Sequence, residues 1–380
     1  MIKQLLAILC IIFTLLSTPL HANAEVSAQA AILTELTSGR VLYSKNSDAR
    51  LPMASTTKIM TALVALEKGA DRLDETIEIS DAAAGVEGSS MYLEKGEKMT
   101  LRELLYGLML PSGNDAAVAI AECIGGSVED FVSMMNQKAE QLRLTNTHFA
   151  NPNGLPDENH YSSARDMAKM TEDAMKNEVF AEIVKSKTYK IAGEGKAYPR
   201  ILTNHNKLLK MYEGCIGVKT GFTKAAGRCL VSSAERDGMT LICVTLNAPD
   251  DWNDHTNMLN YGFENYKLQK ILDSTTPVTT AEVDGAYEAA APLYPERDFF
   301  FPLKDDEDVK VTNNAPSHLN APLTLNQEVG KIRLDGADLS NIEIPIVVRS
   351  DIKEISKIKT LGEKLTESIQ IFFAEWAGLL

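Results

Sequence analysis

Two kinds of apolar spacing follow one another along the chain, and their order is the strongest constraint on its fold. Period-two alternation and β-branched residues predict strands at residues 30–37, 40–43, 215–218, 229–233 and 240–246. The stretch from residue 80 to residue 176 shows mostly helical spacing. Strands at both ends of a helical middle favour an α/β (α+β) domain in which N-terminal and C-terminal strands share one sheet.

The composition changes after Leu272, which suggests further domains. Residues 273–349 contain segments of alternating apolar and polar residues, as expected for a small all-β domain. Residues 350–380 carry apolar side chains three or four positions apart, which predicts an amphipathic helix. This helix either packs on its own domain or lies on the outer face of the cytoplasmic membrane, and its aromatic end favours the membrane.

The first 24 residues have the features of a secretory signal peptide. Lys3 supplies a positive charge, residues 5–16 are apolar apart from one threonine, and Ala22-Asn23-Ala24 offers a cleavage site. The apolar run is too short to span a bilayer. We therefore expect an exported protein whose first mature domain covers residues 25–272.

Charge and cysteine content exclude several classes of function. The net charge of −14, without a long basic cluster, argues against a nucleic-acid partner. Four cysteines follow the signal peptide, but neither a Cys-x-x-Cys pair nor nearby histidines complete a metal site. We expect no metal and no cofactor. The cysteines are most simply buried thiols, although Cys229 and Cys243 flank a hairpin and a disulfide between them is possible.

Ser55 and Lys58 open a predicted helix that ends at Gly69. Residues three positions apart share a helix face, so the Lys58 nitrogen can reach the Ser55 hydroxyl. A serine hydroxyl attacks once a base takes its proton, and lysine can be that base if its pKa falls from about 10.4 towards neutrality. Burial and a second cation, for which Lys219 is the candidate, act in that direction. The alternative is a simple helix cap with an exposed lysine.

A second motif, Ser112-Gly113-Asn114, lies on a turn before an Ala-rich helix that runs from Asp115 to Cys123. Helix capping alone would explain such residues. In the functional interpretation, Ser112 relays a proton and Asn114 binds a substrate amide. The presence of the other motifs favours this interpretation.

The third motif, Lys219-Thr220-Gly221, falls on a predicted strand. Gly221 permits close approach of a substrate backbone. The Lys219 cation and the hydroxyls of Thr220 and Thr223 can hold a terminal carboxylate. The backbone N–H groups of Ser55 and Phe222 could form an oxyanion hole. The alternative is an exposed lysine on an edge strand.

In this order, the three motifs resemble those of D-alanyl-D-alanine carboxypeptidases, the low-molecular-mass penicillin-binding proteins. The resemblance covers residues 27–270 and, more loosely, the tail. The matching segments are residues 52–62, 110–115, 146–149, 151–155, 160–166 and 217–223.

This resemblance implies a β-lactamase/transpeptidase-like sheet flanked by helices with a helical subdomain. It implies removal of the terminal D-alanine from peptidoglycan stem pentapeptides through an acyl-enzyme on Ser55, and covalent inhibition by β-lactam antibiotics. It also implies Ser112 as the proton relay, and Lys219 with Thr220 and Thr223 as the carboxylate site. How Lys58, Ser112 and Lys219 divide the work of the base stays open.

The sequence departs from the family pattern at two places. His205 stands where members often carry a basic residue, and the loop 247–252 lacks an arginine that many members have. Carboxylate binding would then rely more on Lys219. His160 and Asp166 are expected to organise their loop rather than to perform chemistry.

Other functions share parts of this pattern. A serine β-lactamase would use the same three motifs, but the sequence has no convincing Glu-x-x-x-Asn loop for fast deacylation. A non-catalytic wall-binding scaffold is disfavoured by the intact Ser55, Lys58 and Lys219. An endopeptidase or a transpeptidase would use the same acyl-enzyme with another leaving group or acceptor.

Overall fold

The computed structural model describes residues 26–192 and 199–354, together with residues 362, 365, 366, 368 and 369. The predicted signal peptide at 1–24 lies outside the described residues, as does most of the predicted helix at 350–380. The described residues divide into two units between Asn265 and Tyr266. No helix among them is long and apolar enough to cross a membrane.

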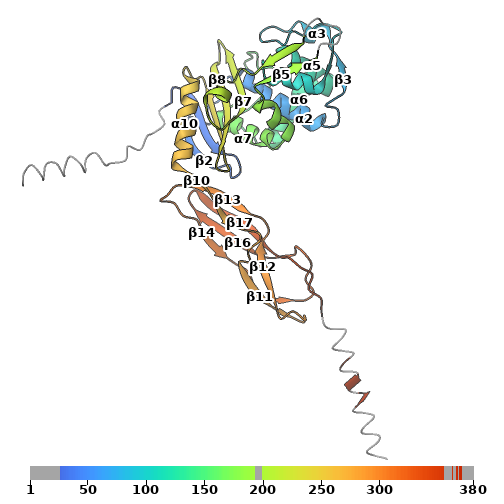
Figure 1. Cartoon of the computed structure of the whole chain (residues 1–380), viewed down its shortest axis with the longest axis vertical. Coiled ribbons are helices and arrows are strands. Elements are labelled where there is room, and N and C mark those ends of the chain that lie inside the picture. The colour runs from blue at the N-terminus through green and yellow to red at the C-terminus, as the bar shows by residue number, and fades with distance from the viewer. Residues whose placement is uncertain (1–25, 193–198, 355–361, 363–364, 367, 370–380) are drawn as a thin grey trace, which may run out of the picture. The chain divides into compact units, whose positions relative to one another are not determined.

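The first unit is built on a five-stranded antiparallel sheet with the order β2-β1-β9-β8-β7 (Figure 1). The strands are β1 (Ala30–Glu35), β2 (Val41–Lys45), β7 (Cys215–Thr223), β8 (Gly227–Arg236) and β9 (Met239–Leu246). Strand β1 pairs with β9 from Ala30↔Leu246 to Glu35↔Leu241. The two ends of the unit therefore share one sheet, as the sequence predicted.

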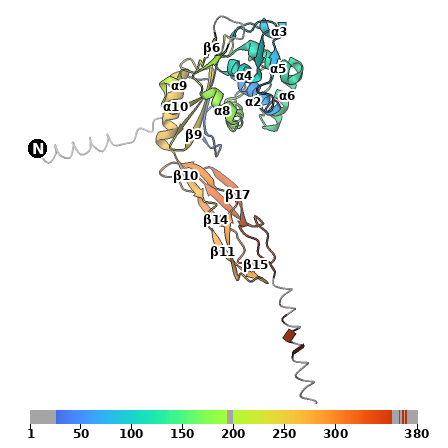
Figure 2. The same cartoon turned by 45° about the vertical axis from the view of Figure 1, so that its right-hand side comes forward.

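Helices cover both sides of this sheet. Figures 1 and 2 show α10 on one side and the helical subdomain on the other. The longer helices are α2 (Lys58–Lys68), α4 (Leu101–Met109), α5 (Asn114–Gly125), α6 (Val128–Gln141), α7 (Ala164–Met175), α8 (Glu178–Lys185) and α10 (Asp251–Asn265). The short ones are the 3-10 turn η1 (Ala54–Thr57), α3 (Asp81–Ala84) and α9 (Leu208–Met211). The predicted α/β (α+β) fold class is confirmed by these layers and by the structural matches given below.

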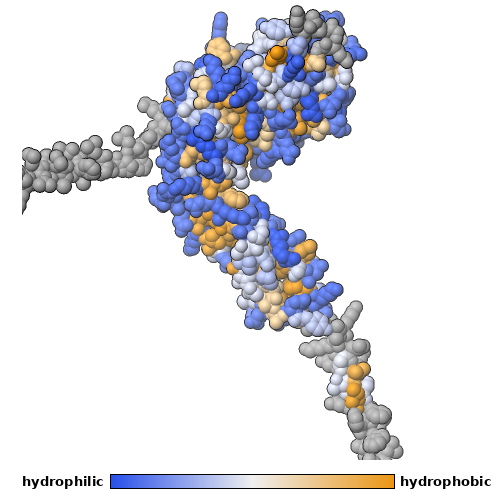
Figure 3. Space-filling view, in the orientation of Figure 1, coloured by the Kyte–Doolittle hydropathy of each residue, from blue (hydrophilic) through white to orange (hydrophobic). Residues whose placement is uncertain are grey.

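The helical region also contains two small hairpins. These are β3 (Thr76–Glu78) with β4 (Lys98–Thr100), and β5 (Thr188–Ile191) with β6 (Arg200–Thr203). Hydrophilic residues cover most of the face of the first unit in Figure 3, and its apolar side chains form a continuous core between the sheet and the helices.

The second unit is all β, as expected. A six-stranded sheet has the order β14-β16-β17-β12-β11-β15, and β10 pairs with β13. The strands are β10 (Lys267–Leu272), β11 (Thr279–Asp284), β12 (Ala290–Pro295), β13 (Phe299–Leu303), β14 (Lys310–Asn313), β15 (His318–Asn320), β16 (Glu328–Gly336) and β17 (Leu339–Val348). The unit begins before β10, whereas the sequence placed the boundary after residue 272. The reason is that β10 pairs with β13 and thus belongs to the second sheet system.

The four cysteines of the described chain are free thiols. In the β8–β9 hairpin Cys243 stands opposite Ser232, not opposite Cys229. The disulfide that the sequence left open is therefore not formed, because the strand register places the two thiols at different levels of the ladder.

Candidate active site

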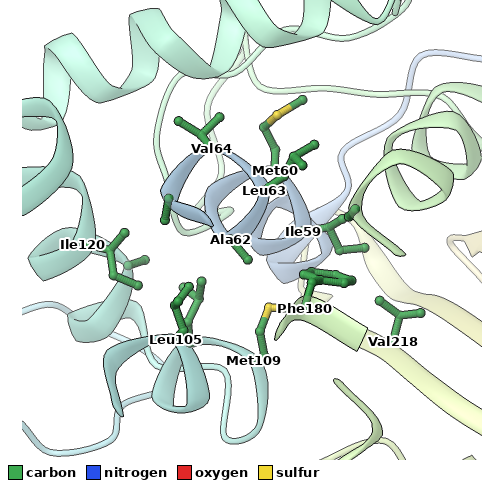
Figure 4. Packing of buried hydrophobic residues seen from close by; sticks show 14 of the residues in the cluster. Ile59, Met60, Ala62, Leu63, Val64, Leu105, Met109, Ile120, Phe180 and Val218 are labelled. Atoms are coloured by element: carbon green, nitrogen blue, oxygen red, sulfur yellow. The ribbon is translucent and has the colours of Figure 1, made fainter. Parts of the chain in front are cut away.

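The first motif is fixed in place by a buried helix. Every residue of α2 from Lys58 to Leu66 is buried. Its apolar side chains belong to the continuous core of the first unit. In Figure 4, Ile59 lies beside Phe180 of α8 and Ala62 points towards Leu105 of α4, whereas Met60, Leu63 and Val64 point to the other side of the helix. The turn η1, which carries Ser55, precedes this helix directly. Ser55 therefore stands in a short 3-10 turn rather than in the first turn of the α-helix, and the packed helix leaves it little freedom to move.

The Ser55 hydroxyl and the Lys58 amine are in direct contact. The distance from Lys58 Nζ to Ser55 Oγ is 2.9 Å. The same nitrogen donates to Asn114 Oδ1 at 2.7 Å and to the backbone oxygen of Asn153 at 2.6 Å. The last two are carbonyl oxygens, which only accept hydrogen bonds, whereas a hydroxyl can also donate. An uncharged amine fits this set, since its two N–H groups meet the carbonyls and its lone pair faces the Ser55 hydrogen.

The surroundings of Lys58 favour that uncharged form. Its side chain is fully buried. Burial lowers the pKa of Lys58 well below its ordinary value, and the positive charge of Lys219 adds to the effect, while Asp115 opposes it. Burial also lowers the pKa of Lys219 to about 7. The lowered pKa of Lys58 favours the uncharged amine next to Ser55, which is the form that can accept a proton.

The second motif brings a hydroxyl and an amide to the same place. Ser112 adopts a left-handed backbone conformation, with φ of 66°, and is buried. Its Oγ atom has no hydrogen-bond partner among the described residues. A buried hydroxyl without a partner is unusual in a folded protein, so Ser112 is ready to bond with a bound molecule. Asn114 bridges Lys58 and the Glu87 backbone oxygen, which its Nδ2 reaches at 2.7 Å.

Asp115, next to this motif, holds the loop above it. Its buried carboxylate accepts hydrogen bonds from the backbone N–H groups of Met91 and Leu93, each at 3.1 Å, and from the Ser90 hydroxyl at 2.6 Å. The loop also supplies Ser89, whose backbone oxygen accepts from the Asn114 N–H at 2.7 Å. The carboxylate therefore ties one wall of the site to the start of α5.

The third motif passes close to the nucleophile along the edge strand β7. A Cβ atom on Gly221 would lie 3.0 Å from the Ser55 backbone nitrogen and 3.1 Å from that of Thr56. Only glycine lets the strand come this near without displacing the turn. Lys219 is 1% exposed and donates to the Thr220 backbone oxygen at 2.9 Å. Phe222, by contrast, is 66% exposed.

One pocket of about 300 Å³ joins the three motifs. Its lining residues are Ser55, Ser89, Ser112, His205, Lys207, Thr220, Gly221, Phe222, Arg228, Asp251 and Trp252. Lys58, Asn114 and Lys219 are buried and do not line it. Thr223 does not line it either, and its hydroxyl accepts from the Ala226 N–H at 3.0 Å in the β7–β8 turn. The structure thus brings the predicted residues together, with Thr223 at the margin.

The sequence reasoning missed several lining residues, above all Arg228 and Trp252. The guanidinium of Arg228 pairs with Asp251 at 2.7 Å, and its Cζ atom lies 5.6 Å from the centre of the Trp252 ring. The signal that could have found Arg228 is the hairpin register, since Arg228 stands opposite Phe222, the residue after the third motif. His205 and Lys207 line the pocket from the segment just before α9.

His160 supports the nucleophile from behind. Its Nδ1 accepts from the Ala150 N–H at 3.0 Å, so the proton is on Nε2, which lies 2.7 Å from Thr57 Oγ1. Burial lowers the pKa of His160 to about 4, so the ring is neutral. Asp166 accepts from the Asn146 N–H and the Thr147 hydroxyl. Both side chains hold loops in place and do not line the pocket. Among the described residues, no group of His, Cys, Asp or Glu is arranged to hold a metal ion.

Comparisons with known proteins agree with this geometry. A family model described as D-alanyl-D-alanine carboxypeptidase matches residues 17–250, and one described as the C-terminal domain of penicillin-binding protein 5 matches residues 266–354. The D-alanyl-D-alanine carboxypeptidase DacF of Bacillus subtilis is 38% identical over 352 residues, which are 88% of this chain and 90% of that protein.

A second relative and a solved structure extend the match. The D-alanyl-D-alanine carboxypeptidase DacA of Escherichia coli is 32% identical, with 96% of this chain and 92% of that protein covered. The crystal structure of penicillin-binding protein 5 from Haemophilus influenzae superposes with a TM-score of 0.74 at 31% identity, covering 87% of this chain and 98% of that one. Both units of the described chain therefore have counterparts in the same proteins.

Proposed function

The chain belongs to the D-alanyl-D-alanine carboxypeptidase family, and on that premise we propose that Ser55 is the nucleophile with which it removes the terminal D-alanine from peptidoglycan stem pentapeptides. The observation that carries this proposal is the 2.9 Å contact between Ser55 Oγ and the buried nitrogen of Lys58. An alcohol and an uncharged amine at this distance form an activated serine.

Acylation begins when Ser55 Oγ attacks the carbonyl carbon between the last two D-alanines. Lys58 Nζ takes the hydroxyl proton as the new C–O bond forms. The carbonyl oxygen becomes an oxyanion that faces the backbone N–H groups of Ser55 and Phe222. The close approach of β7 to η1 at Gly221 supports this pairing of donors, since it brings the two backbones together.

The tetrahedral intermediate then collapses and the C–N bond breaks. The leaving D-alanine nitrogen needs one proton, and the proton held by Lys58 can reach it through the Ser112 hydroxyl. The support for this relay is the Ser112 Oγ atom, which is buried, lines the pocket and has no partner among the described residues. Water then attacks the ester, and Lys58 again accepts and returns a proton, which regenerates Ser55.

The remaining residues bind the peptide. Asn114 positions Lys58 through Oδ1, and the second N–H of its Nδ2 atom is left to meet a substrate carbonyl. Thr220 contributes a hydroxyl near the terminal carboxylate, and Lys219 contributes charge from behind the pocket wall. We propose a lesser role for Thr223, since it does not line the pocket.

Release of D-alanine from a diaminopimelate-containing pentapeptide tests this function. We expect the wild-type chain to release D-alanine and Ser55→Ala to lose nearly all activity. Ser133→Ala, an exposed serine on α6, is the matched control and should keep full activity. If Ser55→Ala released D-alanine at the wild-type rate, another group would be the nucleophile.

The two alternative functions, a serine β-lactamase and a non-catalytic scaffold, predict different behaviour towards penicillin. A carboxypeptidase forms a long-lived acyl adduct on Ser55, a β-lactamase hydrolyses the drug in repeated turnovers, and a scaffold does neither. The family matches support the first outcome. Mass spectrometry of the intact chain after exposure to benzylpenicillin distinguishes the three, because only the first leaves a lasting increase in mass.

We also propose that the chain is exported and that its terminal helix holds it at the outer face of the cytoplasmic membrane. The support is the signal-like segment at 1–24 and the apolar spacing of 350–380. Sedimentation with phosphatidylglycerol vesicles tests the second part. The full chain should sediment, and Phe372→Glu with Trp376→Glu should release it. A full chain that stays in the supernatant would contradict the anchor.

A further inference from the structure

Arg228 stands at the rim of the active-site pocket, on the strand next to the third motif. It is paired with Phe222 across the β7–β8 ladder, and directly paired residues of an antiparallel sheet point to the same face. Both side chains line the pocket together with Ser55 and Thr220. A cation on β8 therefore faces the same space as the nucleophile.

Two neighbours hold the guanidinium of Arg228. Its Nε and Nη2 atoms donate to the same oxygen of Asp251, at 2.9 and 2.7 Å. Its Cζ atom lies over the Trp252 ring, 5.6 Å from the ring centre, a favourable position for a cation. Asp251 is almost completely buried, whereas the Arg228 side chain is 42% exposed. The ion pair thus fixes the inner edge of the guanidinium and leaves the rest of it accessible.

A guanidinium has five N–H groups in a rigid fork, and Asp251 receives two of them. The same side chain therefore keeps donors for a second carboxylate. Planar two-point recognition of carboxylates is the geometry for which arginine is best suited. The buried Asp251 pre-organises the fork, because it removes the rotational freedom that a free arginine would lose on binding.

The other positive groups near the pocket are less suited to hold an anion. Lys219 is buried behind the wall and its pKa of about 7 leaves it only partly charged at neutral pH. Partial burial and the charge of Lys219 lower the pKa of His205, so that ring is largely neutral. Lys207 also lines the pocket, but its exposed side chain is flexible and lacks the planar fork of an arginine. The loop 247–252 carries no cation, and it supplies Asp251 and Trp252 to hold Arg228.

We propose that Arg228 binds the terminal carboxylate of the substrate peptide, and that it selects for chains that end in a free D-alanine. In this account Asp251 and Trp252 are positioning residues, which act through the orientation of the guanidinium. The proposal rests on the proposed carboxypeptidase function, and it names the residue that gives that function its preference for a free chain end.

A pair of substrates that differ only at the carboxylate tests this. The first is diacetyl-L-Lys-D-Ala-D-Ala, and the second is the same peptide with a C-terminal amide. We expect the wild type to prefer the acid, and Arg228→Gln to lower kcat/KM for the acid about 10- to 100-fold, the range for losing a charge-assisted hydrogen bond. The value for the amide should change by less than about threefold, because the amide offers no anion.

Two further variants separate this role from general effects. Lys224→Gln removes an exposed charge of the β7–β8 turn that does not line the pocket, and it should leave the acid-to-amide ratio within about threefold of wild type. Arg228→Lys keeps the charge without the fork and should restore part of the preference. It also provides the test if Arg228→Gln fails to fold. Equal losses on both substrates in the Arg228 variants would overturn the proposal, because they would show a structural role alone.

The result for the wild type distinguishes this failure from failure of the proposed function. If the wild type releases D-alanine from the acid and Ser55→Ala does not, the proposed function holds whatever the Arg228 variants show. If the wild type hydrolyses neither substrate and takes up no penicillin, the function itself is wrong and the proposal for Arg228 falls with it.

Discussion

The two units of the chain differ in what they bury. Among the described residues, every buried polar or charged side chain belongs to the first unit, and they include Lys58, Asp115 and Lys219. The core of the second unit is apolar throughout its described part. Its charges lie outside, as in the exposed ion pair between Lys331 and Glu343.

This contrast shows that the first unit buries charged groups at its active site, at a cost in folding stability. Burying an amine costs free energy unless hydrogen bonds compensate for its lost hydration. In the first unit this cost lowers the pKa of Lys58 and so favours its uncharged form next to Ser55, which is the form that a base requires. Nothing comparable is needed in the second unit, where burial of apolar side chains stabilises the fold directly. The two units can therefore be perturbed separately, and each perturbation should affect a different property.

The largest effect is expected from Lys58→Met, which keeps most of the length of the side chain and removes the base. The rate of Ser55 acylation by a fluorescent penicillin should fall by about 10²- to 10⁴-fold, the usual contribution of general base catalysis. Lys331→Met in the second unit is the matched control, and its acylation rate should equal that of the wild type. If Lys58→Met is acylated as fast as the wild type, Lys58 is not the base. The buried amine of the first unit would then have no catalytic role to set against the apolar core of the second unit.

A substitution in the core of the second unit should lower stability and leave the acylation rate unchanged. Ile344 is fully buried in the second unit, and Ile344→Ala should lower the free energy of unfolding of that unit by about 2–5 kcal/mol. Penicillin acylation of Ser55 should not change, because Ile344 belongs to a separate core. Urea unfolding followed by circular dichroism, together with the acylation rate, checks both parts. A parallel loss of acylation at low urea would mean that the units depend on one another.

A smaller effect should appear in the pH dependence of stability. The pKa of Lys219 is about 7 in the folded chain and near 10.5 in the unfolded chain. Between these values the unfolded state binds more protons, so this residue makes the folded state gain stability as pH rises, and the gain is lost as pH falls towards 7. The slope has a limit of about 1.4 kcal/mol per pH unit for one proton.

Lys219→Met should remove this contribution. Urea unfolding of the wild type and the variant at pH 7, 8 and 9 gives the difference in slope. Distant titrating groups cancel in the subtraction, whereas Lys58 and His205, whose pKa values the charge of Lys219 lowers, respond to the same substitution. An identical pH dependence for the two chains would show that Lys219 keeps an ordinary pKa in the folded protein.

Much of the site could be predicted because its residues lie in short motifs. The spacing of Ser55 and Lys58 fixed their contact once the helix was recognised, and the glycine of the third motif indicated a close approach. The shared sheet followed from strands at both ends of the region. Each prediction started from a local pattern in the sequence, although the sheet and the approach of Gly221 join distant segments of the chain.

The rest depends on contacts that have no local signature. The backbone oxygen of Asn153 accepts from Lys58, and any residue type could supply such an oxygen. Arg228 meets Asp251 only because the β8 strand and the start of α10 come together in the fold. The hydroxyl of Thr223 was expected at the carboxylate, but this residue does not line the pocket. A motif names residue types, and tertiary packing decides which of their atoms remain available.

The charge state of Lys58 is the claim on which the mechanism depends most. Lysine labelled at Nζ and Cε allows each ammonium group to be titrated by NMR, and the signals missing from Lys58→Met and Lys219→Met give the assignments. We predict that Lys58 titrates well below 10.5 and that Lys219 titrates near 7. If Lys58 keeps its proton up to a pH near 10, it cannot be the base for Ser55, and the account is wrong.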